Sequence, residues 1–186
     1  RTDKVEVPAN GSAETPIESL ATQYERLREA LASEVLERVK KCSPLFFERL
    51  VILLLVRMGY GGSLKDAGHA IGKSRDGGID GVIRQDKLGL DNIYIQAKRW
   101  NDKPVGSPDI DQFAGALSKM KASKGIFITT SVFTKDARAS VYSSRIILID
   151  GTQLAGYMID HDVGVSIAST YEIKKVDSDF FEEDLE

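Results

Sequence analysis

The sequence predicts an α/β protein in which a mixed central sheet has helices on both faces. Two helical segments come before any strand, two segments of alternating apolar and polar residues then form a hairpin, and helices and strands alternate after it. A hairpin supplies an antiparallel pair of strands, whereas strands joined through a helix pair in parallel. Both kinds of pairing are therefore expected in one sheet.

Two start signals predict the first two helices. Thr15-Pro16-Ile17-Glu18 combines a capping residue, a proline at the first helical position and an acid three residues after the cap, and the helix is expected to run to about Lys41. Ser43-Pro44 repeats the signal, and residues 45–58 are apolar nearly all round before Gly59, which predicts a buried second helix. Glu48 is the exception on this helix, and its carboxylate needs a partner there.

The remaining elements follow from hydrophobic periodicity and helix-start signals. Residues 79–84 and 92–98 alternate with period two and predict the hairpin, and Ser107-Pro108 starts a helix to about Ala122. The other expected elements are a strand at 125–130, a helix at 134–143, a strand at 145–149, a helix at 152–161 and a strand at 163–168.

Composition indicates one main domain with polar ends. Residues 1–14 are expected to be a linker from an upstream domain, residues 15–176 the main domain, and residues 177–186 an acidic tail. The tail has six acids and no base, so residues 1–176 carry a formal charge of +3 although the whole chain carries -3. A single cysteine, Cys42, excludes an intramolecular disulfide and a cysteine zinc cluster, and no apolar run reaches the length of a membrane span. A cytoplasmic protein that does not bind membranes is expected.

The hairpin brings candidate chemistry to one face of the sheet. With Arg84 opposite Asn92, Asp80 lies opposite Gln96 and next to Lys98, whereas Ile79, Gly81, Ile83, Ile93, Ile95 and Ala97 form the apolar face toward the core. An aspartate, a second oxygen donor and a lysine suit phosphodiester hydrolysis assisted by Mg²⁺ or Mn²⁺, since a hard cation takes oxygen ligands. From spacing alone, Asp80 and Lys98 also fit an ordinary cross-strand ion pair.

Several ordered motifs resemble the catalytic domain of the Mrr-type restriction endonucleases, which restrict modified foreign DNA. The resemblance covers roughly residues 20–175 and rests on 45–51 (LFFERLV), 58–62 (MGYGG), 76–81 (DGGIDG), 95–100 (IQAKRW), 113–117 (FAGAL), 125–131 (GIFITTS) and 148–151 (LIDG). It implies the restriction-endonuclease-like fold of the PD-(D/E)xK nucleases, with Asp80, Gln96 and Lys98 at a metal centre. It further implies a type IV enzyme that cleaves methylated double-stranded DNA and has a winged-helix domain upstream.

Gln96 departs from the acidic residue that most PD-(D/E)xK nucleases have at this position. An amide oxygen can bind Mg²⁺ but supplies no charge, so another carboxylate is needed, and Glu48 is the natural candidate. The alternative for Glu48 is a salt bridge with Arg49 or a surface position. Two further functions stay open: a catalytically inactive DNA-binding or scaffolding module, and a structure-selective nuclease such as a junction resolvase.

Basic and aromatic side chains near the hairpin are candidates for a DNA track. They are Lys73, Arg75, Arg84, Arg99, Trp100 and Lys103. The alternative is a solvated loop rim in which Trp100 covers the edge of the core. Because cleavage of a duplex cuts two strands, a homodimer or a higher homo-oligomer is expected.

Overall fold

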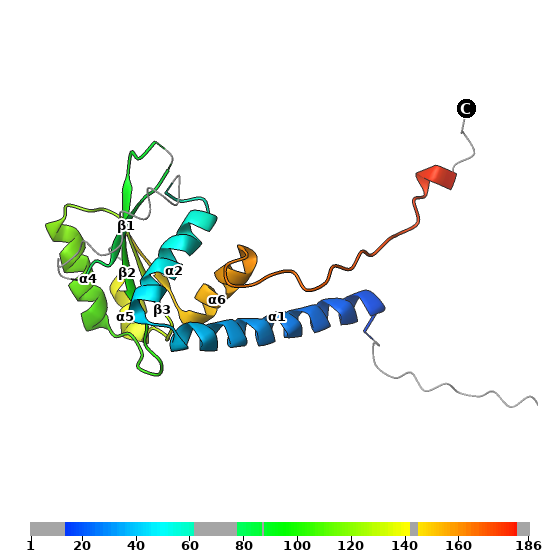
Figure 1. Ribbon diagram of the computed structural model, residues 1–186, viewed down its shortest axis with the longest axis horizontal. Helices are drawn as coiled ribbons and strands as arrows, with labels where there is room; N and C mark the ends of the chain where they lie inside the picture. The colour runs from blue at the N-terminus through cyan, green and yellow to red at the C-terminus, as the bar shows by residue number, and fades with distance from the viewer. Residues whose placement is uncertain (1–13, 62–77, 87, 142–144, 182–186) are drawn as a thin grey trace, which may run out of the picture.

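The computed structural model describes residues 14–61, 78–86, 88–141 and 145–181 of the chain (Figure 1). Its elements are α1 (Pro16–Lys41), α2 (Pro44–Arg57), β1 (Gly81–Arg84), β2 (Asn92–Lys98), α4 (Ser107–Lys119), β3 (Gly125–Thr129), α5 (Lys135–Ser140), β4 (Ile146–Ile149), α6 (Gly151–Asp160) and a 3-10 turn η3 (Asp179–Phe181). The α/β class is confirmed. Three parts of the predictions lie outside the described residues: residues 1–13 of the predicted linker, residues 142 and 143 of the predicted helix at 134–143, and the last five residues of the acidic tail.

Both predicted N-terminal helix starts are confirmed. The Thr15 hydroxyl accepts from the Glu18 N–H, the Glu18 carboxylate accepts from the Thr15 N–H at 2.7 Å, and the Ser43 hydroxyl accepts from the Phe46 N–H at 3.2 Å. The expectation that α2 is buried throughout is wrong at its first turn, where Leu45 and Phe46 are half exposed. The helix packs on the sheet through the side that carries the fully buried Phe47, so the opposite side of that turn faces solvent.

The sheet has four strands in the order β1-β2-β3-β4. β1 and β2 are antiparallel in the predicted register, with Arg84 opposite Asn92, whereas β2, β3 and β4 are parallel. The sheet is thus mixed, as expected. Because β2, β3 and β4 are parallel, their carboxyl ends share one edge, which is where ligands bind in many open α/β sheets.

Helices cover both faces of the sheet (Figure 1). On one face α1, α2 and α6 pack on isoleucines of all four strands, including Ile83, Ile95 and Ile128. On the other face α4 and α5 cover a second core. In this core the Phe127 ring packs edge to face against Phe113 and Phe133, with 5.7 Å between ring centroids in both pairs. Polar side chains near the ends of β1 and β2 are therefore held between two packed layers.

Two predictions in the second half of the chain, the end of α4 and a last strand, differ from the structure. This helix ends at Lys119 rather than near Ala122, because Lys121 adopts a positive φ of 53° that turns the chain. The strand predicted at 163–168 is wrong. Val163 is buried in the core, but the following residues have no adjacent strand and Ile167 is largely exposed, so the alternation there does not form a ladder. Among the described residues, no helix has both the length and the apolar character needed to cross a bilayer.

Candidate active site

Asp80 lies immediately before β1, where the hairpin ladder ends. Its N–H donates to the carbonyl of Ile95 at 2.8 Å, and its Oδ2 accepts from the N–H of Ala97 at 2.8 Å. The Asp80 carboxylate therefore accepts the Ala97 N–H that a backbone carbonyl would accept if the β1–β2 ladder continued. The Ala97 N–H holds the side chain and the Ile95 carbonyl holds the backbone, both without Lys98, so the position of Asp80 is fixed by the fold.

Gln96 is buried beside Asp80, with a residue exposure of 2%. Its Nε2 donates to Asp80 Oδ2 at 3.4 Å, and it lies opposite Phe127 in the parallel pair with β3. Gly78 lies next to this amide and has a φ of +108°. A Cβ at this position would lie only 2.9 Å from Gln96 Oε1, so there is room for a hydrogen but not for a side chain. The amide is thus enclosed between the second core, the carboxylate and a glycine backbone.

The same turn explains one wrong face assignment. Ile79 is buried, but it belongs to the core under α4 and α5 and not to the core that contains Ile83 and Ile95. Strict alternation ends at Gly81, because the positive φ of Gly78 redirects the chain before β1 begins. The predicted side is correct for Ile83, Ile93, Ile95 and Ala97, which belong to the core under α1, α2 and α6. Gly81 has no side chain, and it lies at its predicted register position opposite Ile95.

The charges of Asp80, Glu48 and Lys98 interact. Burial raises the pKa of Asp80, and it outweighs the Ala97 N–H, the Lys98 ammonium and the Gln96 amide, each of which lowers that pKa. Burial also raises the pKa of Glu48, and the negative charge of Asp80 raises it further. Glu48 on α2 and Asp80 before β1 are thus two partly desolvated carboxylates close enough to repel each other.

This donor set fits a hard divalent cation. Carboxylate and amide oxygens are the ligands that Mg²⁺ and Mn²⁺ accept, and a cation between Asp80 and Glu48 would relieve the repulsion that raises the pKa of Glu48. Within the described residues, no group of three or more His, Cys, Asp or Glu side chains is placed to hold a metal ion. The set is therefore two carboxylates with Gln96, and a cation held this way keeps several waters.

The residues predicted to contact DNA do not lie together in the structure. Lys103 lies over the half-buried ring of Trp100, with Nζ 4.6 Å from the ring centroid. The guanidinium of Arg99 donates from Nη1 to the carbonyl of Lys40 at 2.7 Å, which ties the end of α1 to the end of β2. Arg84 is exposed at the far end of β1, roughly 13 Å from Asp80 at the rise of a strand. Lys73 and Arg75 lie outside the described residues.

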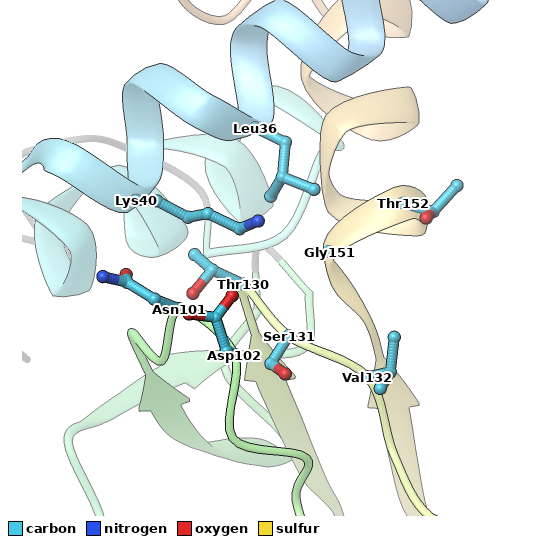
Figure 2. A pocket seen from close by; sticks show the side chains of 9 residues that line it. All are labelled: Leu36, Lys40, Asn101, Asp102, Thr130, Ser131, Val132, Gly151 and Thr152. Carbon is cyan, nitrogen blue, oxygen red and sulfur yellow. The ribbon is translucent and has the colours of Figure 1, made fainter.

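A pocket of about 270 Å³ opens at the carboxyl edge of the sheet (Figure 2). Lys40 reaches over it from α1 and Asp102 lies across from Lys40, while Thr130 and Ser131 follow β3. The Lys40 ammonium is already paired with Glu37 at 2.8 Å, and the Thr130 hydroxyl donates to the carbonyl of Trp100. None of the four predicted catalytic residues lines this pocket. It is thus a neighbour of the carboxylate site and not part of it.

The chain is similar to known restriction endonucleases. A family model described as a restriction endonuclease, Mrr_cat, matches residues 39–158, which include all four candidate catalytic residues. The chain is 46% identical over 169 residues to the type IV methyl-directed restriction enzyme EcoKMrr of Escherichia coli strain K12, covering 90% of this chain and 55% of that enzyme. It thus spans about half the length of this curated relative.

Two solved structures match parts of this chain. The DNA modification-dependent restriction endonuclease AspBHI matches with a TM-score of 0.53 and 20% identity, over 74% of this chain and 36% of that chain. MspJI, solved in complex with a 27-mer oligonucleotide, matches with a TM-score of 0.40 and 17% identity, over 87% of this chain and 37% of that chain. The match to AspBHI shows a shared fold.

Proposed function

Because the chain belongs to the Mrr_cat restriction endonuclease family, we propose that it is the nuclease domain of a type IV restriction enzyme, which hydrolyses phosphodiester bonds in methylated foreign DNA. The observation that carries the proposal is the fixed cluster of Asp80, Gln96 and Lys98, with the Glu48 carboxylate coupled to it. It acts in the cytoplasm on the nucleoid or on invading DNA.

Asp80, Glu48 and the Gln96 amide oxygen are the residues that would hold Mg²⁺ or Mn²⁺. When bound there, the cation would neutralise charge on the scissile phosphate and lower the pKa of the attacking water. Asp80 is already oriented by the Ala97 N–H, so little reorganisation is needed at this ligand. The Gln96 amide currently donates to Asp80, and its oxygen turns toward the ligand site by rotation about the last side-chain bond.

Lys98 acts on the phosphate side of the site. It is half-buried at the end of β2, and within the described ranges its ammonium has no ion pair. An ammonium beside a carboxylate cluster can orient the nucleophilic water and stabilise the negative charge that develops on the phosphate. We assign Lys98 this role.

The DNA backbone would lie along Lys103, Trp100 and Arg84, and the two other predicted DNA contacts, Lys73 and Arg75, lie outside the described residues. Lys103 stacked on Trp100 presents a cation held by an aromatic face beside the end of β2. Arg99 contributes mainly by fixing α1 to β2, because one arm of its guanidinium is used by the Lys40 carbonyl. Each domain has one such site, so cleavage of both strands requires two domains, and the expected partner is a second copy.

The test uses the full-length protein with methylated and unmethylated plasmid. We expect the methylated plasmid alone to be nicked and linearised with Mg²⁺, and no cleavage in EDTA. Equal cleavage of both plasmids would contradict the modification dependence, and cleavage in EDTA would contradict the metal site. A four-way junction cut in preference to the methylated duplex would favour a structure-selective nuclease.

One observation favours a second candidate, an inactive DNA-binding module. Gln96 is neutral, and the described residues place only two carboxylates at the site. Such a module would bind the methylated plasmid without cutting it at any Mg²⁺ or Mn²⁺ concentration. Binding without nicking in the assay above therefore separates the two candidates.

Gly78→Ala is expected to damage the site through Gln96. A Cβ at φ +108° costs on the order of 1–3 kcal/mol in backbone strain and also overlaps Gln96 Oε1 at 2.9 Å, so the amide must move away from Asp80. We expect a lower unfolding temperature and a loss of cleavage of on the order of a hundredfold per folded molecule. Thermal unfolding and plasmid nicking measure the two effects.

Gly59→Ala is the matched control. Gly59 has a similar φ of +99°, but a Cβ there meets no atom within 4 Å. It should lose stability by backbone strain alone and keep its cleavage rate per folded molecule. If Gly78→Ala also keeps its cleavage rate, Gly78 does not position Gln96.

A further inference from the structure

Helix α1 extends well past the domain it belongs to. Its 26 residues span about 39 Å, and only its C-terminal part buries side chains, at Val35 and Val39 (Figure 1). The middle of the helix is tied to the end of α6 by an ion pair between Arg28 and Asp160 at 2.6 Å. The N-terminal half, dark blue in Figure 1, projects from the body.

The projecting half has an apolar seam. Five residues, named the α1 stripe, follow one another at alternating intervals of three and four: Ile17, Leu20, Tyr24, Leu27 and Leu31. Their exposures range from 39% to 72%. This spacing is that of the a and d positions of a heptad repeat, the pattern with which one helix packs along another. The three-four spacing of these apolar residues is already present in the sequence.

The α1 stripe forms one wall of a groove. The groove has a volume of about 460 Å³, and its other wall consists of Ile159 and residues of the extended segment after α6, among them Ala168 and Tyr171. Tyr171 is 85% exposed and adds a large apolar side chain to this wall, which also contains Ser166 and Ser169. Helix and segment together present one continuous apolar surface.

Charge indicates which partner fits this surface. α1 contains five acids and five bases and has no formal net charge, so it has no attraction for DNA or for an acidic peptide. The positions beside the stripe include Ala21, Gln23 and Ala30, and the nearby Arg28 is already neutralised by Asp160. A second α1 can therefore approach closely without facing a like charge.

The exposed apolar area of the α1 stripe and Tyr171 is close to what one partner contributes to a standard protein–protein interface. Aromatic side chains remove roughly 150–250 Å² each when they are fully buried, and leucine and isoleucine remove less, so at the observed exposures the stripe and Tyr171 offer at most about 700 Å² per copy. Each partner in a standard interface contributes roughly 800 Å². The surface of one copy is thus large enough, and its chemistry is complementary to itself.

We propose that the α1 stripe and its groove form a two-fold interface with a second copy of this chain. The same residues of both copies meet along the projecting halves of α1, as a two-fold axis requires. The pairing gives the second nuclease site that cleavage of both DNA strands needs, and that consequence alone rests on the proposed function.

The first test is the mass of the 186-residue chain in solution by analytical ultracentrifugation. We expect a dimer of twice 20.4 kDa at micromolar concentration. Leu27→Glu and Tyr24→Lys place charges in the seam and should raise the dimer dissociation constant by on the order of a hundredfold. Both side chains are more than half exposed, so the unfolding temperature of the monomer should stay unchanged.

Leu90→Glu is the matched control, because Leu90 is 81% exposed in the hairpin turn, away from α1. It should dimerise like the parent chain. A parent chain that is monomeric throughout, or a dimer that survives both stripe substitutions, overturns the interface. Plasmid cleavage is read separately: stripe variants that nick but no longer linearise support both proposals, whereas a dimer that cuts nothing supports the interface and contradicts the proposed function.

Discussion

Asp80→Asn is expected to abolish DNA cleavage while the fold becomes slightly more stable. Asparagine keeps an oxygen for the Ala97 N–H but removes the charge that would bind the cation. The stabilisation of a charged transition state by such a group is worth several kcal/mol, so cleavage should fall on the order of a thousandfold or more. The measurement is plasmid nicking under single-turnover conditions at saturating Mg²⁺.

The stability gain has a defined pH dependence. The pKa of Asp80 is raised in the folded protein, so folding disfavours its charged form. The parent protein therefore loses stability as the pH rises from the ordinary aspartate pKa of about 3.8 through the raised folded pKa, whereas the asparagine variant does not. The advantage of Asp80→Asn should grow across this window and stay constant above it, in urea unfolding at a series of pH values.

Two comparisons separate charge at the site from charge elsewhere. Asp111→Asn changes an exposed aspartate of α4, just after its first turn, and should leave cleavage intact with no gain in stability. Lys98→Ala should lose a similar amount of cleavage but keep its affinity for Mg²⁺, because the carboxylates remain. Cleavage by Asp80→Asn at the parental rate would exclude Asp80 from the site.

The sequence predicts the hairpin well, because local pattern decides it. Alternation of Ile93 and Ile95 with polar residues fixes which side of the hairpin is buried, and the structure has the simplest symmetric register, with Arg84 opposite Asn92. The predicted strand at 163–168 shows the limit of the same rule. Alternation reports which side chains can be buried, and it says nothing about whether a neighbouring strand is available.

The site is predictable in part for the same reason. Asp80, Gln96 and Lys98 come together through the hairpin, and Glu48 is suggested by a carboxylate on an otherwise apolar helix. Arg99 is different. Its charge suggests DNA, yet the structure uses it at the carbonyl of Lys40, 59 residues away in the sequence. Contacts of this kind depend on how α1 and β2 pack, which no local pattern encodes.

Gln96→Glu is expected to make the metal-free protein much less stable and the metal-bound protein nearly normal. Gln96 is 2% exposed and donates a hydrogen bond to Asp80, so glutamate would replace an attraction with a buried repulsion. An uncompensated buried charge costs about 3 kcal/mol or more, which for a chain of this size lowers the unfolding temperature by about 10 °C in EDTA. A divalent cation compensates both carboxylates and should restore most of the loss.

Thermal unfolding in EDTA and across a Mg²⁺ titration measures this effect, and Gln112→Glu is the control. Gln112 is exposed on α4, so the same chemical change there should alter the unfolding temperature little and without dependence on Mg²⁺. The cleavage assay adds a second reading, since the added charge should lower the Mg²⁺ concentration needed for half-maximal nicking. If Gln96→Glu unfolds at the parental temperature in EDTA, or gains nothing from Mg²⁺, then Gln96 does not face a cation site. If it creates nicking where the parent has none, the natural glutamine marks an inactive module whose remaining donors still hold the geometry of a nuclease.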